Sequence, residues 1–161
     1  MEDDQVLRKE LLALLGGGNA HMPFDAAVAD FPEDAMNRRP PNVTYTPWHL
    51  LEHIRRTQND ILEFIRDPKY VSPEWPVGYW PNPEAKATRD AWEATIRGFH
   101  QDLADLLAIV KDPGTQLTAE IPHAPGYNIL REMLLVADHN AYHIGEFGIL
   151  RQVMGTWGKR E

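Results

Sequence analysis

The sequence feature that most constrains the fold is an apolar segment, residues 136–150, that carries two histidines four positions apart. An α-helix turns about 100° per residue, so His139 and His143 lie on one face of the helix that this segment predicts. Glu132 and Glu146 extend the same face, which therefore holds four polar groups where the periodicity predicts a core. Buried polar groups need partners, so other parts of the chain or a bound ion must satisfy them.

Two histidines at this spacing present two ring nitrogens to one ion, and neutral imidazole is the commonest side-chain ligand for a transition metal. Two core histidines that hydrogen-bond to neighbouring helices would give the same pattern. The metal interpretation therefore requires a further ligand from another part of the chain.

Length and composition exclude several classes of protein. A chain of 161 residues is expected to form one domain, residues 1–161, with a core that needs no covalent cross-links. The absence of cysteine excludes disulfides, thiolate metal sites and a cysteine nucleophile. No apolar run is long enough to span a membrane, and the charged start MEDDQVLRKE is not typical of a signal peptide, so a cytoplasmic location is expected.

The charge pattern argues against a nucleic-acid partner. The formal net charge of -8 opposes binding to a polyanion, and no basic stripe compensates for it. Two pairs of basic residues, Arg38 with Arg39 and Arg55 with Arg56, are interpreted as solvated charges rather than as a phosphate clamp.

Apolar periodicity predicts an all-α protein, a four-helix bundle with a short extra helix after the first helix. Nothing in the chain alternates cleanly enough to predict a strand. Thr46 with Pro47, and Asn82 with Pro83, both have the form of a cap residue followed by proline at a first helical position. The predicted helices are residues 3–15, 23–31 (the short one), 46–65, 82–112 and 128–154.

The segment between the second and third long helices, residues 68–83, contains five prolines and cannot form a regular element. Its length predicts a crossover that joins two helices running in the same direction. It also carries several aromatic side chains, which suit a wall over the bundle or over a pocket. These are Tyr70, Trp75, Tyr79 and Trp80.

A second pair of histidines four positions apart lies in the second long helix. His53 borders the apolar stripe and is predicted to point inward, whereas His49 is rotated toward the polar side and is predicted to be a surface or supporting residue. His100 is expected to be exposed. His21 and His123 lie in connections without ligand spacing.

Two segments carry a family resemblance. TPWHLLEHI, followed about ninety residues later by VADHNAYHIGEFGILRQVMG, resembles the DinB/YfiT-like superfamily of metal-dependent enzymes, and GGGNAHMPFDAAVADFP resembles one subgroup. The resemblance implies a four-helix bundle with a long crossover between the second and third helices. It also implies a metal triad of His53, His139 and His143. The family often has glutamine where this chain has Glu146, which leaves open a fourth ligand, a catalytic base or a supporting acceptor.

Three imidazoles without a thiolate suit one divalent transition metal (Zn, Ni or Fe) and leave coordination positions for water or substrate. Two other kinds of catalytic site, a serine hydrolase triad and a di-iron centre, lack the residues that they require. The only serine, Ser72, lies in the proline-rich segment, which argues against a serine hydrolase. The single Glu-x-x-His spacing, Glu120 to His123, lies outside the predicted helices, which argues against a di-iron bundle.

The sequence and the resemblance together favour a metal-dependent transferase or hydrolase that acts on a small thiol or electrophilic metabolite. The expected partners are a small-molecule substrate such as a low-molecular-weight thiol and a second copy of the chain in a homodimer. Nucleic acid and membranes are not expected partners. Two alternatives remain open, namely a non-catalytic metal-binding stress-response or ligand-binding module, and a metal-free carrier whose histidines satisfy one another.

Overall fold

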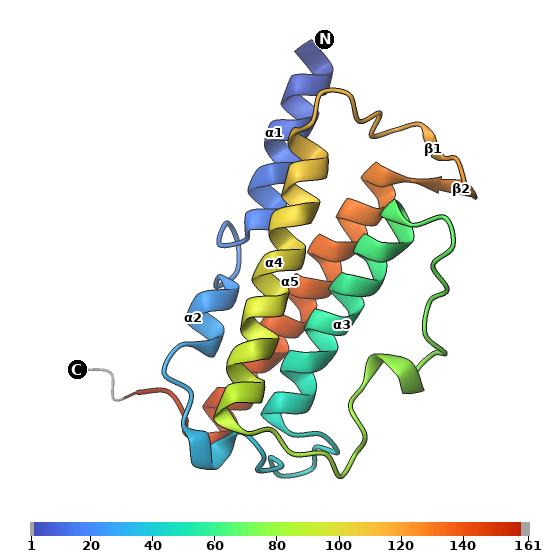
Figure 1. Ribbon diagram of the computed structural model, residues 1–161. Coiled ribbons are helices and arrows are strands. Elements are labelled where there is room, and N and C mark those ends of the chain that lie inside the picture. The colour runs from blue at the N-terminus through green and yellow to red at the C-terminus, as the bar shows by residue number, and fades with distance from the viewer. Residues whose placement is uncertain (1, 159–161) are drawn as a thin grey trace.

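The computed structural model describes residues 2–158, so the predicted domain limits at residues 1 and 161, with the last residues of the polar tail, lie outside the described part. Four long helices form the bundle, which confirms the all-α prediction (Figure 1). The elements are α1 (Glu2–Gly16), α2 (Phe24–Val28), η1 (Glu33–Ala35), α3 (Pro47–Arg66), η2 (Val77–Tyr79), α4 (Arg89–Lys111), β1 (Glu120–Ile121), β2 (Ala124–Asn128) and α5 (Ile129–Met154).

The long crossover has the predicted place in the chain. In Figure 1, α3 and α4 run in one direction, and α1 and α5 run in the other. The segment between α3 and α4 passes along the outside of the bundle from one end to the other and includes the short helix η2. Two parallel neighbouring helices require such a return. The predicted short helix after α1 is also present, as α2.

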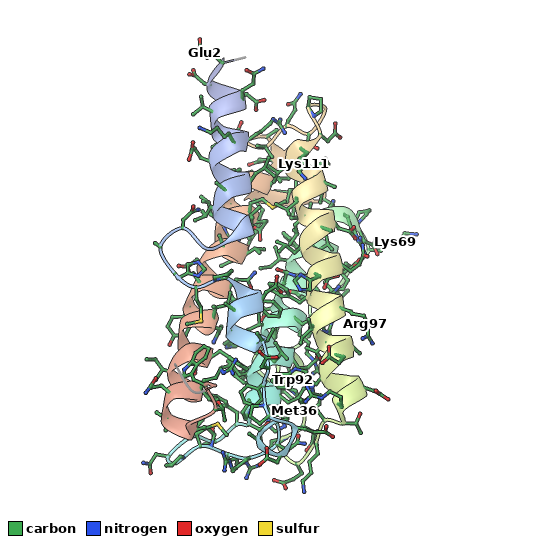
Figure 2. All side chains as sticks on the ribbon, turned by 90° about the vertical axis from the view of Figure 1, so that its left-hand side faces the viewer. Glu2, Met36, Lys69, Trp92, Arg97 and Lys111 are labelled. Atoms are coloured by element: carbon green, nitrogen blue, oxygen red, sulfur yellow. The ribbon has the colours of Figure 1, made fainter. Side chains whose placement is uncertain are left out.

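The core consists of two buried clusters joined by a polar layer. One cluster, at the α2 end, is rich in aromatic side chains and includes the fully buried Trp92 and Met36, both labelled in Figure 2. The other, at the hairpin end, is mainly aliphatic. Between them Asn140 donates to Gln58 Oε1 at 2.8 Å, and Gln58 Nε2 donates to the Phe99 carbonyl at 2.8 Å. The interior of the bundle therefore contains hydrogen-bonded polar groups close to the histidines.

The third long helix begins later than predicted. It starts at Arg89, after Thr88, whose side chain accepts a hydrogen bond from the Ala91 amide. The Asn82 side chain instead accepts from the Glu84 amide and closes a turn within the crossover. A short polar residue before proline suits both a cap and a turn, so the local signal does not separate the two.

The prediction of no strand is wrong for a short hairpin. β1 and β2 pair antiparallel, with Glu120 opposite Asn128 and Ile121 opposite Ala124. Ile121 and Ala124 are buried in the aliphatic cluster. Strands this short show no alternation in the sequence, because backbone pairing and two buried contacts define them.

The sequence predicts His49 as a surface or a supporting residue, and the surface placement is wrong because the residue is only 2% exposed. The Thr46 hydroxyl accepts from the His49 amide, and His49 Nδ1 accepts from the Thr46 amide, which forms a capping box at the start of α3. His49 Nε2 donates to the Ala85 carbonyl of the crossover at 3.0 Å. The capping box usually has glutamate or glutamine at this third position, so a histidine in that role is not what the spacing rule predicts.

Arg55 and Arg56 are not the solvated charges that the sequence suggested. Both bind the buried carboxylate of Glu52, at 2.7 and 3.0 Å, and the Thr95 hydroxyl donates to the same carboxylate. Arg56 also donates to the Trp80 carbonyl at 2.9 Å and so fastens the crossover to α3. Within residues 2–158, no helix is both long and apolar enough to cross a membrane.

Candidate metal site

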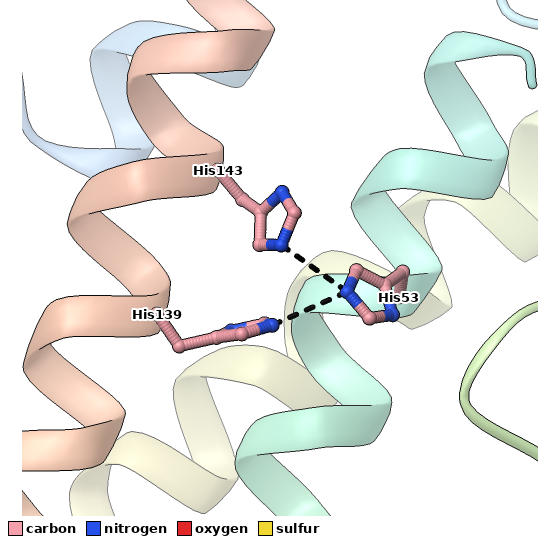
Figure 3. A group of neighbouring side chains, drawn as sticks. All are labelled: His53, His139 and His143. Carbon is pink, nitrogen blue, oxygen red and sulfur yellow. Dashed lines mark hydrogen bonds between the residues drawn. The ribbon is translucent and has the colours of Figure 1, made fainter. Parts of the chain in front are cut away.

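The antiparallel helices α3 and α5 bring three of the predicted ligands together. His53 projects from α3 and is only 2% exposed, while His139 and His143 project from successive turns of α5 toward it (Figure 3). His53 Nε2 lies 3.2 Å from His143 Nε2 and 3.2 Å from His139 Nε2. One ligand atom from each of the three residues lies within 4.8 Å of the others. The group can therefore hold one metal ion.

In two of the rings, the hydrogen bond at Nδ1, which points away from the other histidines, determines that Nε2 carries the lone pair. His53 Nδ1 lies 3.0 Å from the Tyr79 carbonyl, and His143 Nδ1 lies 2.6 Å from Glu146 Oε2. Both partners only accept hydrogen bonds, so each Nδ1 carries the proton and each neutral ring leaves a lone pair on Nε2. The two lone pairs then face each other, an arrangement that a shared cation stabilises. Metal-binding histidines usually have such outer acceptors.

The spacing of the nitrogens also fits a metal ion. Two nitrogens that each lie about 2.05 Å from one ion at a near-tetrahedral angle are about 3.3 Å apart. The two separations from His53 Nε2, 3.2 Å each, agree with this value, and all three ligand atoms lie within 4.8 Å of one another. His139 is the least constrained ring, because its buried Nδ1 has no hydrogen-bond partner among the described residues.

Burial keeps two of the rings in the form that binds metal. It lowers the pKa of His53 to about 4 and the pKa of His139 to about 3, and neighbouring histidines add to both effects. At neutral pH both rings therefore present lone pairs rather than positive charges. Burial alone would raise the pKa of Glu146, but hydrogen bonds from His143 and Tyr45 outweigh it, so the net shift is downward and the carboxylate stays ionised.

The Tyr45 side chain completes the site and was not singled out from the sequence. Its hydroxyl donates to Glu146 Oε1, so Tyr45, Glu146 and His143 form a chain of hydrogen bonds that ends on a candidate ligand. Burial, followed by the contact with Glu146, raises the pKa of Tyr45 and keeps the hydroxyl protonated. A contact between residues 101 positions apart leaves no local signal in a sequence.

The crossover covers the site, as the sequence suggested for its aromatic residues. The Trp80 ring stacks on the His53 ring with centroids 4.0 Å apart and planes 6° apart. Trp80 and Tyr45 also line a cavity of about 460 Å³. Trp75, by contrast, is largely exposed, although its ring contacts Tyr79. Two of the four predicted aromatic residues therefore contact the His53 ring, Trp80 through its own ring and Tyr79 through its backbone carbonyl.

The other candidates from the sequence lie away from the triad. Among residues 2–158, no further histidine or carboxylate joins the group of three. His100 is exposed, as predicted, His21 is half-buried in its loop and His123 lies on the hairpin. Glu132 is buried near the start of α5, two turns before His139.

The lowered pKa values predict that the metal-free protein is sensitive to acid. An unfolded histidine titrates near 6.5, so below that pH the unfolded state binds more protons than His53 and His139 do in the folded state. We expect the free energy of unfolding of chelator-treated protein to fall by roughly 2 kcal/mol or more between pH 7 and pH 5. Denaturant titrations at each pH measure it.

A matched variant isolates the histidines from other titrating groups. His139→Gln removes one of the two shifted groups, so its loss of stability over the same pH range should be smaller. Equal slopes for the variant and the parent chain would contradict this assignment of the acid sensitivity.

A model of a known protein family matches most of the chain. The DinB superfamily model matches residues 19–147, a span that includes all three candidate ligands and covers more than half of the chain. No curated protein and no solved structure matches the chain. By this match, the chain belongs to the DinB superfamily.

Proposed function

We propose that the protein is a metal-dependent transferase or hydrolase acting on a small thiol or electrophilic metabolite. In this proposal His53, His139 and His143 hold one divalent transition metal, Zn, Ni or Fe. The observation that carries it is the convergence of three Nε2 atoms whose outer nitrogens, in two rings, are bound to acceptors. Three protein ligands leave a coordination position open, whereas structural sites usually close with four.

Bound there, the ion would lower the pKa of a coordinated water or thiol and polarise a coordinated carbonyl oxygen. The chain's own residues define where a substrate would lie. The cavity beside the site has a volume of about 460 Å³, within the range of small-molecule sites. Its walls are mainly apolar and aromatic, which favours a small substrate with an apolar part. The lining residues are Thr44, Tyr45, His49, Trp80, Pro81 and Pro83.

Within this proposal, Glu146 acts mainly by positioning His143. Its Oε2 accepts from His143 Nδ1 and its Oε1 accepts from Tyr45, so both oxygens are already engaged. This favours an orienting role over a fourth ligand or a base. The assignment of Glu146 as a catalytic residue stays a prediction, and a single substitution separates the roles.

Glu146→Gln is expected to weaken metal binding about tenfold, the lower end of the range for losing an outer partner of a ligand. Glutamine can still accept from His143 Nδ1, so the ring keeps its orientation but loses the adjacent negative charge. Competition with a chelator measures the metal Kd, and Glu93→Gln on α4 is a matched control away from the site. Normal metal affinity with turnover lost would indicate instead that Glu146 acts on the substrate as a base.

The proposed activity is tested with protein loaded separately with zinc, nickel or ferrous iron. We expect transfer of a low-molecular-weight thiol to an electrophile such as 1-chloro-2,4-dinitrobenzene, or hydrolysis of a thioester. Chelator-treated protein and His53→Ala are the controls, and both should be inactive. If metal binds at one ion per chain but no thiol or ester is turned over, the non-catalytic binding module is the better description.

A homodimer and a cytoplasmic location remain parts of the proposal. Three exposed apolar side chains, Leu135, Tyr142 and Ile149, recur every seven residues on α5, and this spacing suits helix pairing. Sedimentation at several concentrations tests for the dimer, with Tyr142→Lys as the disrupting variant. A monomer at all concentrations would remove the dimer from the proposal. Fractionation of cells that express the chain tests its location.

A further inference from the structure

A second cavity lies at the hairpin end of the bundle, apart from the one beside the triad. Its volume is about 450 Å³, which would accommodate a small organic molecule. Residues from α3, the crossover, the hairpin and α5 line it, so four separate segments contribute to one concave surface. The lining includes Asp60, Phe64, Ser72, His123, Tyr127 and Glu132.

Two of the lining residues are carboxylates with little exposure to solvent. Asp60 is 9% exposed. Its Oδ2 accepts from the Tyr79 hydroxyl at 2.8 Å, whereas the buried Oδ1 has no partner within the described chain. Glu132 is 2% exposed, and its Oε1 pairs with Arg131 at 2.5 Å. The Tyr79 hydroxyl, with the Tyr70 hydroxyl as a further neighbour, offsets only part of the cost of burying a carboxylate without a cation.

The surrounding groups leave Asp60 without a cation from the protein. No ion pair to it occurs between residues 2 and 158, and the Arg131 guanidinium is committed to Glu132 and to the Tyr127 ring, 4.8 Å from its centroid. His123 Nε2 lies 2.8 Å from the Phe64 carbonyl and donates to it. The cavity lining therefore contains two carboxylates, and the arginine that pairs with Glu132 is not part of that lining.

The aromatic walls suit the same kind of ligand. The rings of Phe64 and Tyr127 meet edge to face, with centroids 5.4 Å apart. An organic cation gains from a carboxylate and from an aromatic face at the same time, and the Arg131 guanidinium makes both kinds of contact, with Glu132 and Tyr127. A hard divalent ion prefers several oxygen ligands and its own water molecules, so the aromatic walls suit an organic cation better.

We propose that this cavity binds the ammonium group of a small organic amine, with Asp60 as its main partner and Glu132 as a second carboxylate. The site requires neither the metal nor the proposed activity, although Tyr79 joins the two regions. Its hydroxyl donates to Asp60, and its carbonyl accepts from His53. An amine in the cavity would thus lie next to a residue that supports a candidate metal ligand.

The test measures binding of benzylammonium by ligand-observed NMR, with benzyl alcohol as the neutral counterpart of the same shape. We expect benzylammonium to bind at least about tenfold more tightly than benzyl alcohol, because it adds a charge-assisted hydrogen bond. Asp60→Asn should remove most of this preference, and Glu132→Gln should reduce it. Glu10→Gln, on the exposed side of α1, is the matched control and should leave it unchanged.

A stability measurement distinguishes this role from a structural one. Asparagine retains an acceptor for Tyr79 but removes the uncompensated charge, so ligand-free Asp60→Asn should unfold at an equal or higher temperature than the parent chain. The proposal is overturned if the two probes bind equally, or if Asp60→Asn leaves the preference intact. A lower unfolding temperature for ligand-free Asp60→Asn would also overturn it, because it would show that the charge has a structural role. Repeating the titration on chelator-treated protein should give the same Kd, which keeps the outcome separate from the metal proposal.

Discussion

Replacing His53 with alanine is expected to reduce metal content from about one ion per chain to near zero. His53 is the one candidate ligand from α3, and its Nε2 lies 3.2 Å from both of the other Nε2 atoms. Removing it leaves two imidazoles from a single helix, which bind a divalent ion far more weakly than three. We expect the metal Kd to rise by more than about a hundredfold, beyond the usual effect of losing an outer partner.

Elemental analysis and competition with a chelator measure the change. His100→Ala is a suitable control, because it removes an exposed histidine on α4 and should keep full metal content. Circular dichroism checks that His53→Ala retains its helices. If the parent chain and the variant are both free of metal after purification with added zinc, nickel or iron, the result favours the metal-free carrier and excludes the proposed activity.

Replacing Arg151 with methionine is expected to cause a large loss of stability. Arg151 on α5 is 2% exposed, and its guanidinium donates to the carbonyls of Ala27, Ala29 and Thr156 at 2.7 to 2.8 Å. It also stacks on Trp157, 4.1 Å from the ring centroid. Methionine fills a similar volume but leaves three carbonyl oxygens without their donor.

We expect the free energy of unfolding to fall by about 3 to 5 kcal/mol, the usual cost of removing one side of a buried polar network. The midpoint of thermal unfolding should fall by about 10 °C for a chain of this length. Arg97→Met on α4 is the control, because Arg97 is exposed (Figure 2) and its loss should change stability by less than about 0.5 kcal/mol. A loss below about 1 kcal/mol for Arg151→Met would show that water replaces the guanidinium.

The features that follow from local spacing could be predicted from the sequence. Thr46 with Pro47 marks the start of α3, and the apolar periodicity gives the four long helices. Two histidines four apart on α5 must share a face, and His53 follows from its position beside the apolar stripe. The spacing thus nominates all three members of the group that the structure brings together.

What the sequence could not give depends on contacts between distant residues. Asn82 and Thr88 both have the form of a helix cap, and only the tertiary contacts of the crossover decide between them. Tyr45 meets Glu146 from the loop that directly precedes α3, and Asp60 lines a cavity built by four segments. Periodicity describes one element at a time, so these pairings lie beyond it.

The contact between the crossover and His53 makes the electronic character of a candidate ligand depend on a loop. The Tyr79 carbonyl draws on the Nδ1 proton of His53, and this makes Nε2 a stronger electron donor. If the segment that contains Tyr79 moved outward to admit a substrate, the imidazole would lose that acceptor and become a weaker base. Movement of the crossover away from the site would then also weaken the binding of the metal by His53.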